Sequence, residues 1–137
     1  MDESIPENLI LPALIARLES VCSNVKAGYP ATGLEDEIDV PAILVQLESL
    51  TELNRSGHRG LYQLQFLISL AVRTSEATTE SLLQLSHQIR QALAPGTRLC
   101  PEARKLKLTE TLFDIAPAHG HLSFADTGLQ VETVLSP

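Results

Sequence analysis

Residues 61–73 read LYQLQFLISLAVR, and apolar side chains alternate along one face of this stretch. The even-numbered positions are all apolar or aromatic: Tyr62, Leu64, Phe66, Ile68, Leu70 and Val72. A period of two is typical of a strand that buries one face. Because usual strands have about 5–6 residues, we expect this one to project beyond its sheet and to offer an arm to a neighbouring molecule.

A second strand and a turn precede this stretch. Residues 40–50 alternate in the same way, and residues 54–60 form a polar turn with two glycines. Two alternating segments joined by such a turn predict a long antiparallel hairpin. The predicted core of the sheet consists of Ile43, Val45, Leu47, Leu64, Phe66, Ile68 and Leu70.

Two segments have the apolar stripe of an amphipathic helix, residues 8–22 and residues 75–93. Asn8 is expected to cap the first helix, with Pro12 in its first turn. Thr74 or Ser75 is expected to cap the second. The side chains predicted to pack on the sheet are Leu14, Leu18, Leu85 and Ile89.

Three further segments complete the predicted sheet. Residues 24–29 form a short strand, and residues 104–116 form a strand whose apolar phase slips, which predicts a bulge near Thr109 and Glu110. A turn at residues 126–128 precedes a last strand that ends near Leu135. One domain over residues 1–137 is therefore predicted, of α+β class, with two helices packed on an antiparallel or mixed sheet.

Composition narrows the classes of function. Hydrophobic residues make up 44% of the chain and charged residues 20%, which is a globular composition. Three Phe, two Tyr and no Trp leave few platforms for sugars or single-stranded nucleic acid. The acidic N-terminus lacks the pattern of a signal peptide, and no apolar run reaches the length of a membrane span, so a cytoplasmic protein without a membrane partner is expected.

The net charge of −7 is unevenly distributed. Residues 1–48 hold nine acids and two bases, whereas residues 49–137 hold eight of each. The acidic first third argues against specific nucleic-acid binding, since phosphates need cations. Unlike patches suit head-to-tail assembly, although acidic side chains also simply keep a surface soluble.

No constellation of residues in the sequence predicts catalysis or a metal site. The chain has no nucleotide-binding glycine loop. His119 and His121 could share one face of a strand, but no third ligand has a fixed spacing to them. The acidic cluster at residues 35–37 lacks the alternate spacing of a calcium loop. We therefore expect no cofactor, no metal and no enzymatic activity.

The remaining candidate groups are two thiols and one imidazole. Cys22 lies on the apolar stripe of the first helix and is expected in the core. Cys100 precedes Pro101 in a loop, where exposure is possible, but the sequence places no base beside it. His87 lies next to the stripe of the second helix and is expected to be a partly buried structural residue.

The order of elements resembles a known family. The chain has an N-terminal helix, a strand that opens with Pro41 (residues 40–45), a hairpin with Gly and Arg, the long strand at residues 62–73, then a helix and two strands. Over residues 9–135 this is similar to the tail-terminator proteins of long-tailed phages, including Mu-like prophage minor tail proteins and phage-tail-derived bacteriocins. The resemblance implies a ring, typically a homohexamer, that caps the tail tube, stops tail polymerisation and offers a surface to the head-tail connector protein. It also implies assembly in the host cytoplasm and a final place in the virion tail.

A ring needs two different patches on each subunit. One predicted side of the subunit or tail-tube interface consists of Arg55, His58, Arg59 and Arg73, and the other of Glu35, Asp36 and Glu37. Solvated loops are the alternative for these charges. Two other functions stay open, a small α+β ligand-binding or regulatory dimer of ferredoxin-like type, and a small metal-dependent enzyme that uses His119 and His121.

Overall fold

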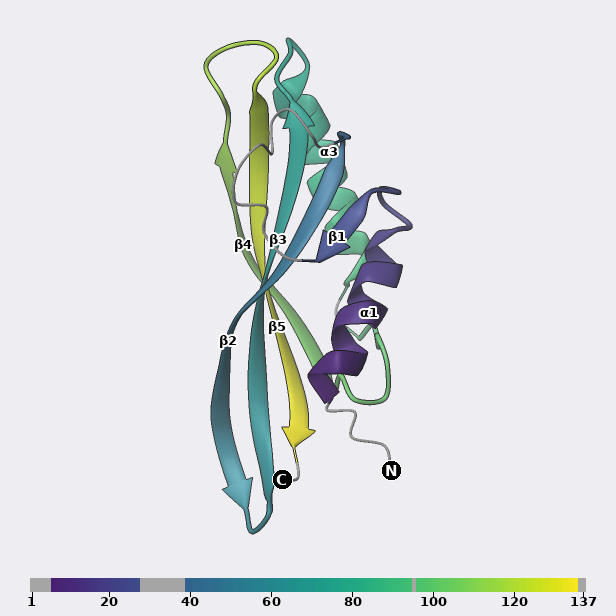
Figure 1. The fold of residues 1–137 in the computed structure, drawn as a ribbon, viewed down its shortest axis with the longest axis vertical. Helices are drawn as coiled ribbons and strands as arrows, with labels where there is room; N and C mark the ends of the chain where they lie inside the picture. Colours follow the sequence, from purple (N-terminus) through teal and green to yellow (C-terminus); the bar gives the residue numbers. More distant parts are fainter. Residues whose placement is uncertain (1–5, 28–38, 95, 136–137) are drawn as a thin grey trace.

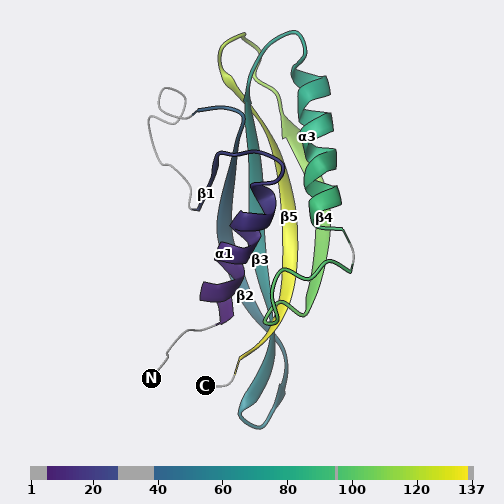
Figure 2. The same cartoon turned by 90° about the vertical axis from the view of Figure 1, so that its right-hand side faces the viewer.

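A five-stranded mixed sheet carries both helices on one face (Figures 1 and 2). The computed structural model describes residues 6–27, 39–94 and 96–135. The elements are α1 (Pro6–Leu18), β1 (Val25–Ala27), β2 (Ala42–Ser56), β3 (Arg59–Arg73), α3 (Thr78–Ala92), β4 (Lys105–Asp114) and β5 (Leu122–Leu135). The strand order is β1-β2-β3-β5-β4. β1 is parallel to β2 and all other neighbours are antiparallel, which confirms the predicted α+β class.

The long hairpin is present and is longer than predicted. β2 and β3 have 15 residues each, and only Gly57 and His58 separate them. Gly57 has a φ of 64°, the positive value that a type II′ turn requires at its first loop position. β3 also pairs with β5 along almost its whole length, from Gly60 to Arg73.

The predicted core is confirmed with one exception, Leu47. The helix-facing residues of β3 from Leu64 to Leu70 are buried against α1 and α3, together with Ile43, Val45, Leu14, Leu18 and Ile89. Leu85 is partly buried and packs against this core, as predicted. Leu47 is 44% exposed, which contradicts its predicted place in the core. The hairpin runs past the helices in Figure 1, so beyond Val45 the side chains of β2 find no helix to pack on.

The helix ends differ from the prediction. α1 begins at Pro6 and ends at Leu18, so Pro12 lies inside the helix and not in its first turn. α3 begins at Thr78, and its N-cap residue Ala77 makes no capping side-chain bond. No helix among the described residues is long and apolar enough to cross a membrane.

The turn predicted at residues 126–128 does not exist, because β5 is continuous from Leu122 to Leu135. Thr127 is buried on the helix-facing side opposite Ile68. The predicted bulge in β4 is confirmed, since the register shifts between Leu108 and Thr111. Gly128 lies opposite this bulge, where a Cβ would collide with the hydroxyl of Thr109. The glycine that suggested a turn is instead needed for close packing of two strands.

We expect Phe66→Ala to lower the free energy of unfolding by about 3–5 kcal/mol, the usual range for a buried Phe. Phe66 is 1% exposed and belongs to the buried cluster that the sheet shares with α1 and α3. Urea denaturation followed by circular dichroism measures the loss. Phe113→Ala is the control, because Phe113 is 45% exposed and should lose far less. A loss below about 1 kcal/mol for Phe66→Ala, the range of ordinary surface changes, would place Phe66 outside the core.

Candidate assembly interface

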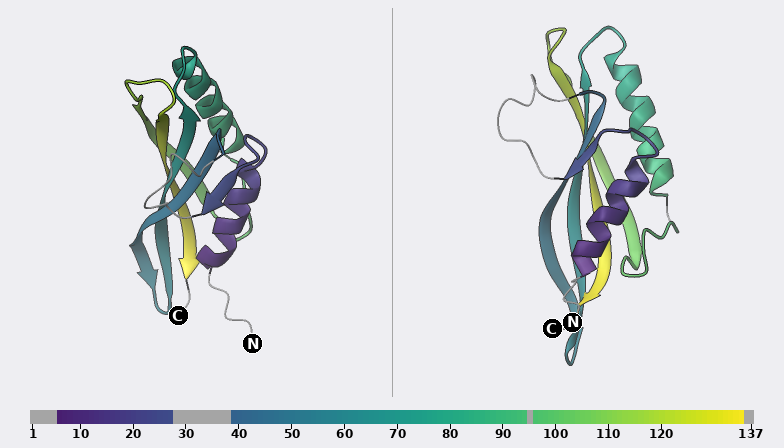
Figure 3. Two further views of the ribbon diagram at one scale, coloured as in Figure 1. Left: turned by 45° about the horizontal axis from the view of Figure 1, so that its top comes forward. Right: turned by 45° about the vertical axis from the view of Figure 1, so that its right-hand side comes forward.

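The distal half of β2 has a free edge and an exposed surface. β1 pairs only with residues Ile43 to Val45, so in the described part of the chain no strand pairs with the other edge of β2, the one away from β3, beyond that point. Every side chain from Leu47 to Ser56 is exposed. Leu47, Leu50 and Leu53 are each 44–46% exposed, and Figure 3 shows this arm extending past α1. An unpaired edge with apolar side chains is a template for another chain.

Three side chains tie the two strands of the arm together. Arg55 Nη2 lies 2.9 Å from Glu52 Oε1 and donates to Tyr62 Oη at 2.6 Å, while the Tyr62 hydroxyl donates to Glu52 Oε1 at 2.9 Å. A register shift between Glu52 and Asn54 brings Glu52 and Arg55 to the same face as Tyr62. Gly60 leaves room for this cluster, since a Cβ there would collide with the Tyr62 ring.

The cluster also shifts the ionisation of its members. The hydrogen bond from Arg55 lowers the pKa of Glu52, and the bond to the Glu52 carboxylate raises the pKa of Tyr62. Arg55 therefore has an acidic partner within its own chain.

The structure separates the residues predicted for the basic side of the interface. Arg55, His58 and Arg59 are exposed together at the hairpin tip. Arg73 lies at the other end of β3, on the order of 45 Å away at about 3.3 Å per strand residue. There its Nη1 donates to Gly120 O at 2.8 Å, so Arg73 and the hairpin tip mark the two ends of the strand side that was predicted as an interface. The predicted acidic side, Glu35, Asp36 and Glu37, lies outside the described residues.

A second basic segment joins the hairpin tip. Two adjacent hollows of about 420 and 320 Å³ share Arg59 and Arg104 in their walls, and Arg98 and Glu102 line the smaller one. The residues around Arg104 are far from Arg59 in sequence. They meet because β5 pairs with both β3 and β4. No local sequence pattern connects these cations, because the strand order alone brings them together.

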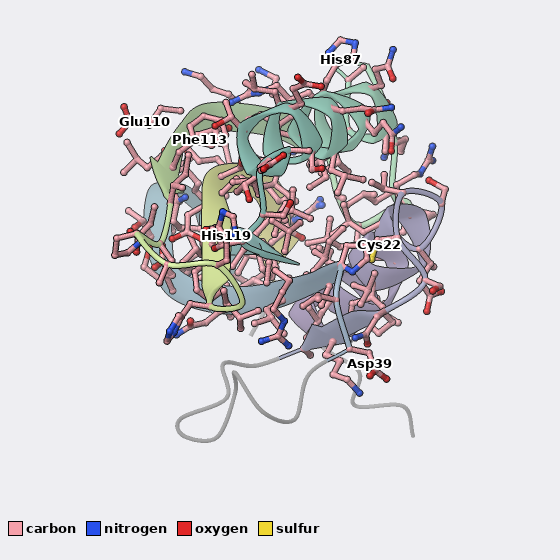
Figure 4. The ribbon with its side chains drawn as sticks, turned by 90° about the horizontal axis from the view of Figure 1, so that it is seen from above. Cys22, Asp39, His87, Glu110, Phe113 and His119 are labelled. Carbon is pink, nitrogen blue, oxygen red and sulfur yellow. The ribbon has the colours of Figure 1, made fainter. Side chains whose placement is uncertain are left out.

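β4 forms the opposite free edge of the sheet. Among the described strands it pairs only with β5. Lys105 and Lys107 are exposed, and so are Leu112 at 61% and Phe113 at 45%. Figure 4 shows Glu110 and Phe113 at this margin of the molecule.

Helix α3 holds β4 at its bulge. Arg90 Nη2 donates to Thr109 O at 2.6 Å and to Thr111 Oγ1 at 2.9 Å. The part-buried carbonyl of Thr109 at the bulge thus has a charged donor, which stabilises the position of this edge.

The candidate catalytic and metal-binding residues are scattered. His119 and His121 are exposed in the loop between β4 and β5, and His87 is exposed on the outer side of α3 (Figure 4), not half-buried as predicted. Within the described ranges, no three His, Cys, Asp or Glu side chains gather as metal ligands. Cys22 is buried as predicted and donates to Pro41 O at 3.0 Å. Cys100 is half-buried, and both thiols are free.

One solved structure shares the fold over most of the chain. It is a chain of the structure described as "Virion of native gene transfer agent (GTA) particle", with a TM-score of 0.57 and 13% identity. The match covers 92% of each chain. No family model matches the sequence, and no curated protein matches it either. The likeness therefore concerns the fold.

We expect the order of the arm to depend on pH. The pKa of Glu52 is lowered in the folded chain, so its stabilising contribution is complete above its unfolded pKa of about 4.3 and is lost as pH falls through the folded pKa. NMR titration of the Glu52 carboxyl and amide exchange of residues 47–60 measure this. Glu52→Gln should remove the dependence in that range. An unchanged profile in Glu52→Gln would show that another group controls it.

Proposed function

We propose that this chain is a virion assembly protein that forms a homohexameric ring on the end of a phage tail tube, stops tail polymerisation and provides the head-joining surface. The observation that carries this proposal is the fold that it shares, over 92% of both chains, with a component of a phage-like virion particle. A shared fold is an analogy and not a site, so the ring, the partners and the tail-terminator role rest on the geometry described above together with the resemblance of the sequence.

Two features of the structure support a place between a tube and a head. The hairpin arm and the basic patch formed by Arg59, Arg98 and Arg104 lie at one end of the strands. The loop at residues 115–121 and Arg73 lie at the other end. A ring that stacks between two different partners needs two different ends. In this proposal one end contacts the tail tube protein and the other contacts the head-tail connector protein.

The proposal includes no catalysis, no cofactor and no membrane. Assembly takes place in the host cytoplasm, and the protein then stays in the virion tail. The scattered histidines and thiols are consistent with a structural role, and a turnover that disappears in His119→Ala or His121→Ala would contradict it.

The ferredoxin-like alternative is not favoured by the sheet. In that fold the parallel strands of each βαβ unit are split by another strand. Here the parallel strands β1 and β2 are direct neighbours. A ligand-binding dimer of that type therefore has no support in the strand order.

We expect purified protein to shorten tail tubes that polymerise in its presence, and to show by light scattering a mass near six times the chain mass of 14.9 kDa. The mass is measured with and without tubes. A dimer under both conditions, with tube length unchanged, would contradict the terminator role.

We expect Arg59→Glu to weaken capping of the tube, because it reverses a charge in the basic patch at the arm end. Electron microscopy of tube lengths measures the effect. Arg17→Glu is the matched control, since Arg17 carries the same charge change at the exposed end of α1. Equal capping by the two variants would exclude the basic patch as the tube contact.

A further inference from the structure

We infer that neighbouring subunits join edge to edge, with the free half of β2 in one copy pairing antiparallel with β4 of a second copy. This inference deepens the proposed function and rests on it, since it names the contact that builds the ring. Both strands have a free edge in the described part of the chain, and each leaves backbone groups without a strand partner.

The strand directions fit a ring. β3 is antiparallel to β2, β5 is antiparallel to β3, and β4 is antiparallel to β5. β2 and β4 therefore run in opposite directions within one subunit. Rotation about an axis along the strands keeps those directions, so β2 of one copy meets β4 of the next in the antiparallel sense. Because the two edges differ, each subunit keeps one edge free for a further copy until the ring closes.

The free parts of the two edge strands also lie at the same level along the strand direction. Each residue of β3 defines a row that runs through β2 on one side and through β5 to β4 on the other. Four rows connect Leu47 with Leu108, Ser49 with Lys107, Leu50 with Leu106, and Thr51 with Lys105. Rotation without translation brings the members of each row side by side in neighbouring copies.

Apolar side chains match in this register. Leu47 and Leu50 lie in the rows of Phe66 and Leu64, on the face that carries the helices. Leu106 and Leu108 lie in the same rows and are only half-buried. Contact between copies would cover the exposed leucines of β2 and extend the core of one subunit towards the next. The opposite face would pair polar Ser49 and Thr51 with lysines.

Charges match in the same register. Residues 46–53 of β2 contain two acids, Glu48 and Glu52, and no base. Glu52 already forms an ion pair with Arg55 of the same strand, so the match between copies depends on Glu48. Residues 105–108 of β4 contain two bases, Lys105 and Lys107, and no acid. Glu48 forms the bulge between Leu47 and Ser49, which places it beside Lys107 of the neighbour. Opposite charges across neighbouring strands are favourable, and like charges are not.

The same charges disfavour symmetric dimers. A two-fold axis at Leu50 would set Glu48 of each copy against Glu52 of the other. A two-fold axis at Leu106 would set Lys105 against Lys107. Lysines and bulges normally protect a sheet edge from indiscriminate pairing. Here the lysines of β4 still allow pairing with the acidic edge of β2. Heterologous pairing is the arrangement in which both edges find opposite charge.

A disulfide between two residues of one row, placed in neighbouring copies, tests the contact. Thr51→Cys and Lys105→Cys in one chain place thiols on facing edges, and opposed antiparallel residues have Cα atoms about 4.5–5.5 Å apart, within the range for a disulfide. Cys100→Ser removes the half-buried native thiol, while buried Cys22 stays. Under mild oxidation we expect a covalent ladder up to the full ring on non-reducing gels. Each single-cysteine variant should stay monomeric on the same gels.

The outcomes separate this inference from the proposed function. If the double variant forms rings by light scattering and caps tubes but gives no ladder, the edge contact is wrong and the terminator role stands. Dimers from either single variant would indicate a symmetric edge contact and overturn the inference. If the wild type neither oligomerises nor caps tubes, both proposals fail.

A charge exchange gives a second, independent measurement. We expect Glu48→Lys to weaken ring association roughly tenfold or more, because like charges at an interface are costly. Lys107→Glu in the same chain should restore it, since the pair is then opposite again. The control is Glu80→Lys on α3, an exposed acid outside both edges. If Glu48→Lys and Glu80→Lys act alike, or Lys107→Glu restores nothing, the register is wrong.

Discussion

Antiparallel pairing of β3 with strands on both sides is the constraint on which the rest of the structure depends. β2 and β5 each follow β3 for most of its length, and this fixes which side chains face the helices. The apolar side chains at alternate positions from Leu64 to Leu70 are buried because both neighbouring strands hold β3 in one register. A shift by one residue would turn Phe66 and its neighbours to the other face. The long core strand and the long exposed arm are thus two ends of one element.

The extent of the two helices determines which part of the sheet is exposed. α1 and α3 together contain 28 helical residues and pack on part of a sheet whose longest strands have 15. Beyond their reach the arm relies on backbone pairing and on the cluster of Glu52, Arg55 and Tyr62. Exposed leucines there and at the end of β4 lower the solubility of an isolated subunit. In the proposed ring a neighbouring subunit would cover the leucines of the arm.

Charged side chains are also unevenly placed on the surface. The chain is acidic overall, yet the structure gathers Arg59, Arg98 and Arg104 at one end and keeps Glu48 and Glu52 on one edge. Surface charges of this kind add little stability within one chain. Between chains they steer association and select the partner and register. Their placement on edges and ends therefore bears on assembly more than on folding.

By itself the sequence determined the class of fold, the long hairpin, the bulge in β4 and the buried face of β3, because apolar periodicity is a local property of the chain. It misjudged Leu47 and residues 126–128, since burial of Leu47 depends on helix cover and the strand at Thr127 depends on pairing with β3. Which edges stay free and which cations lie together follows from the strand order, because strand order joins residues that no local pattern connects.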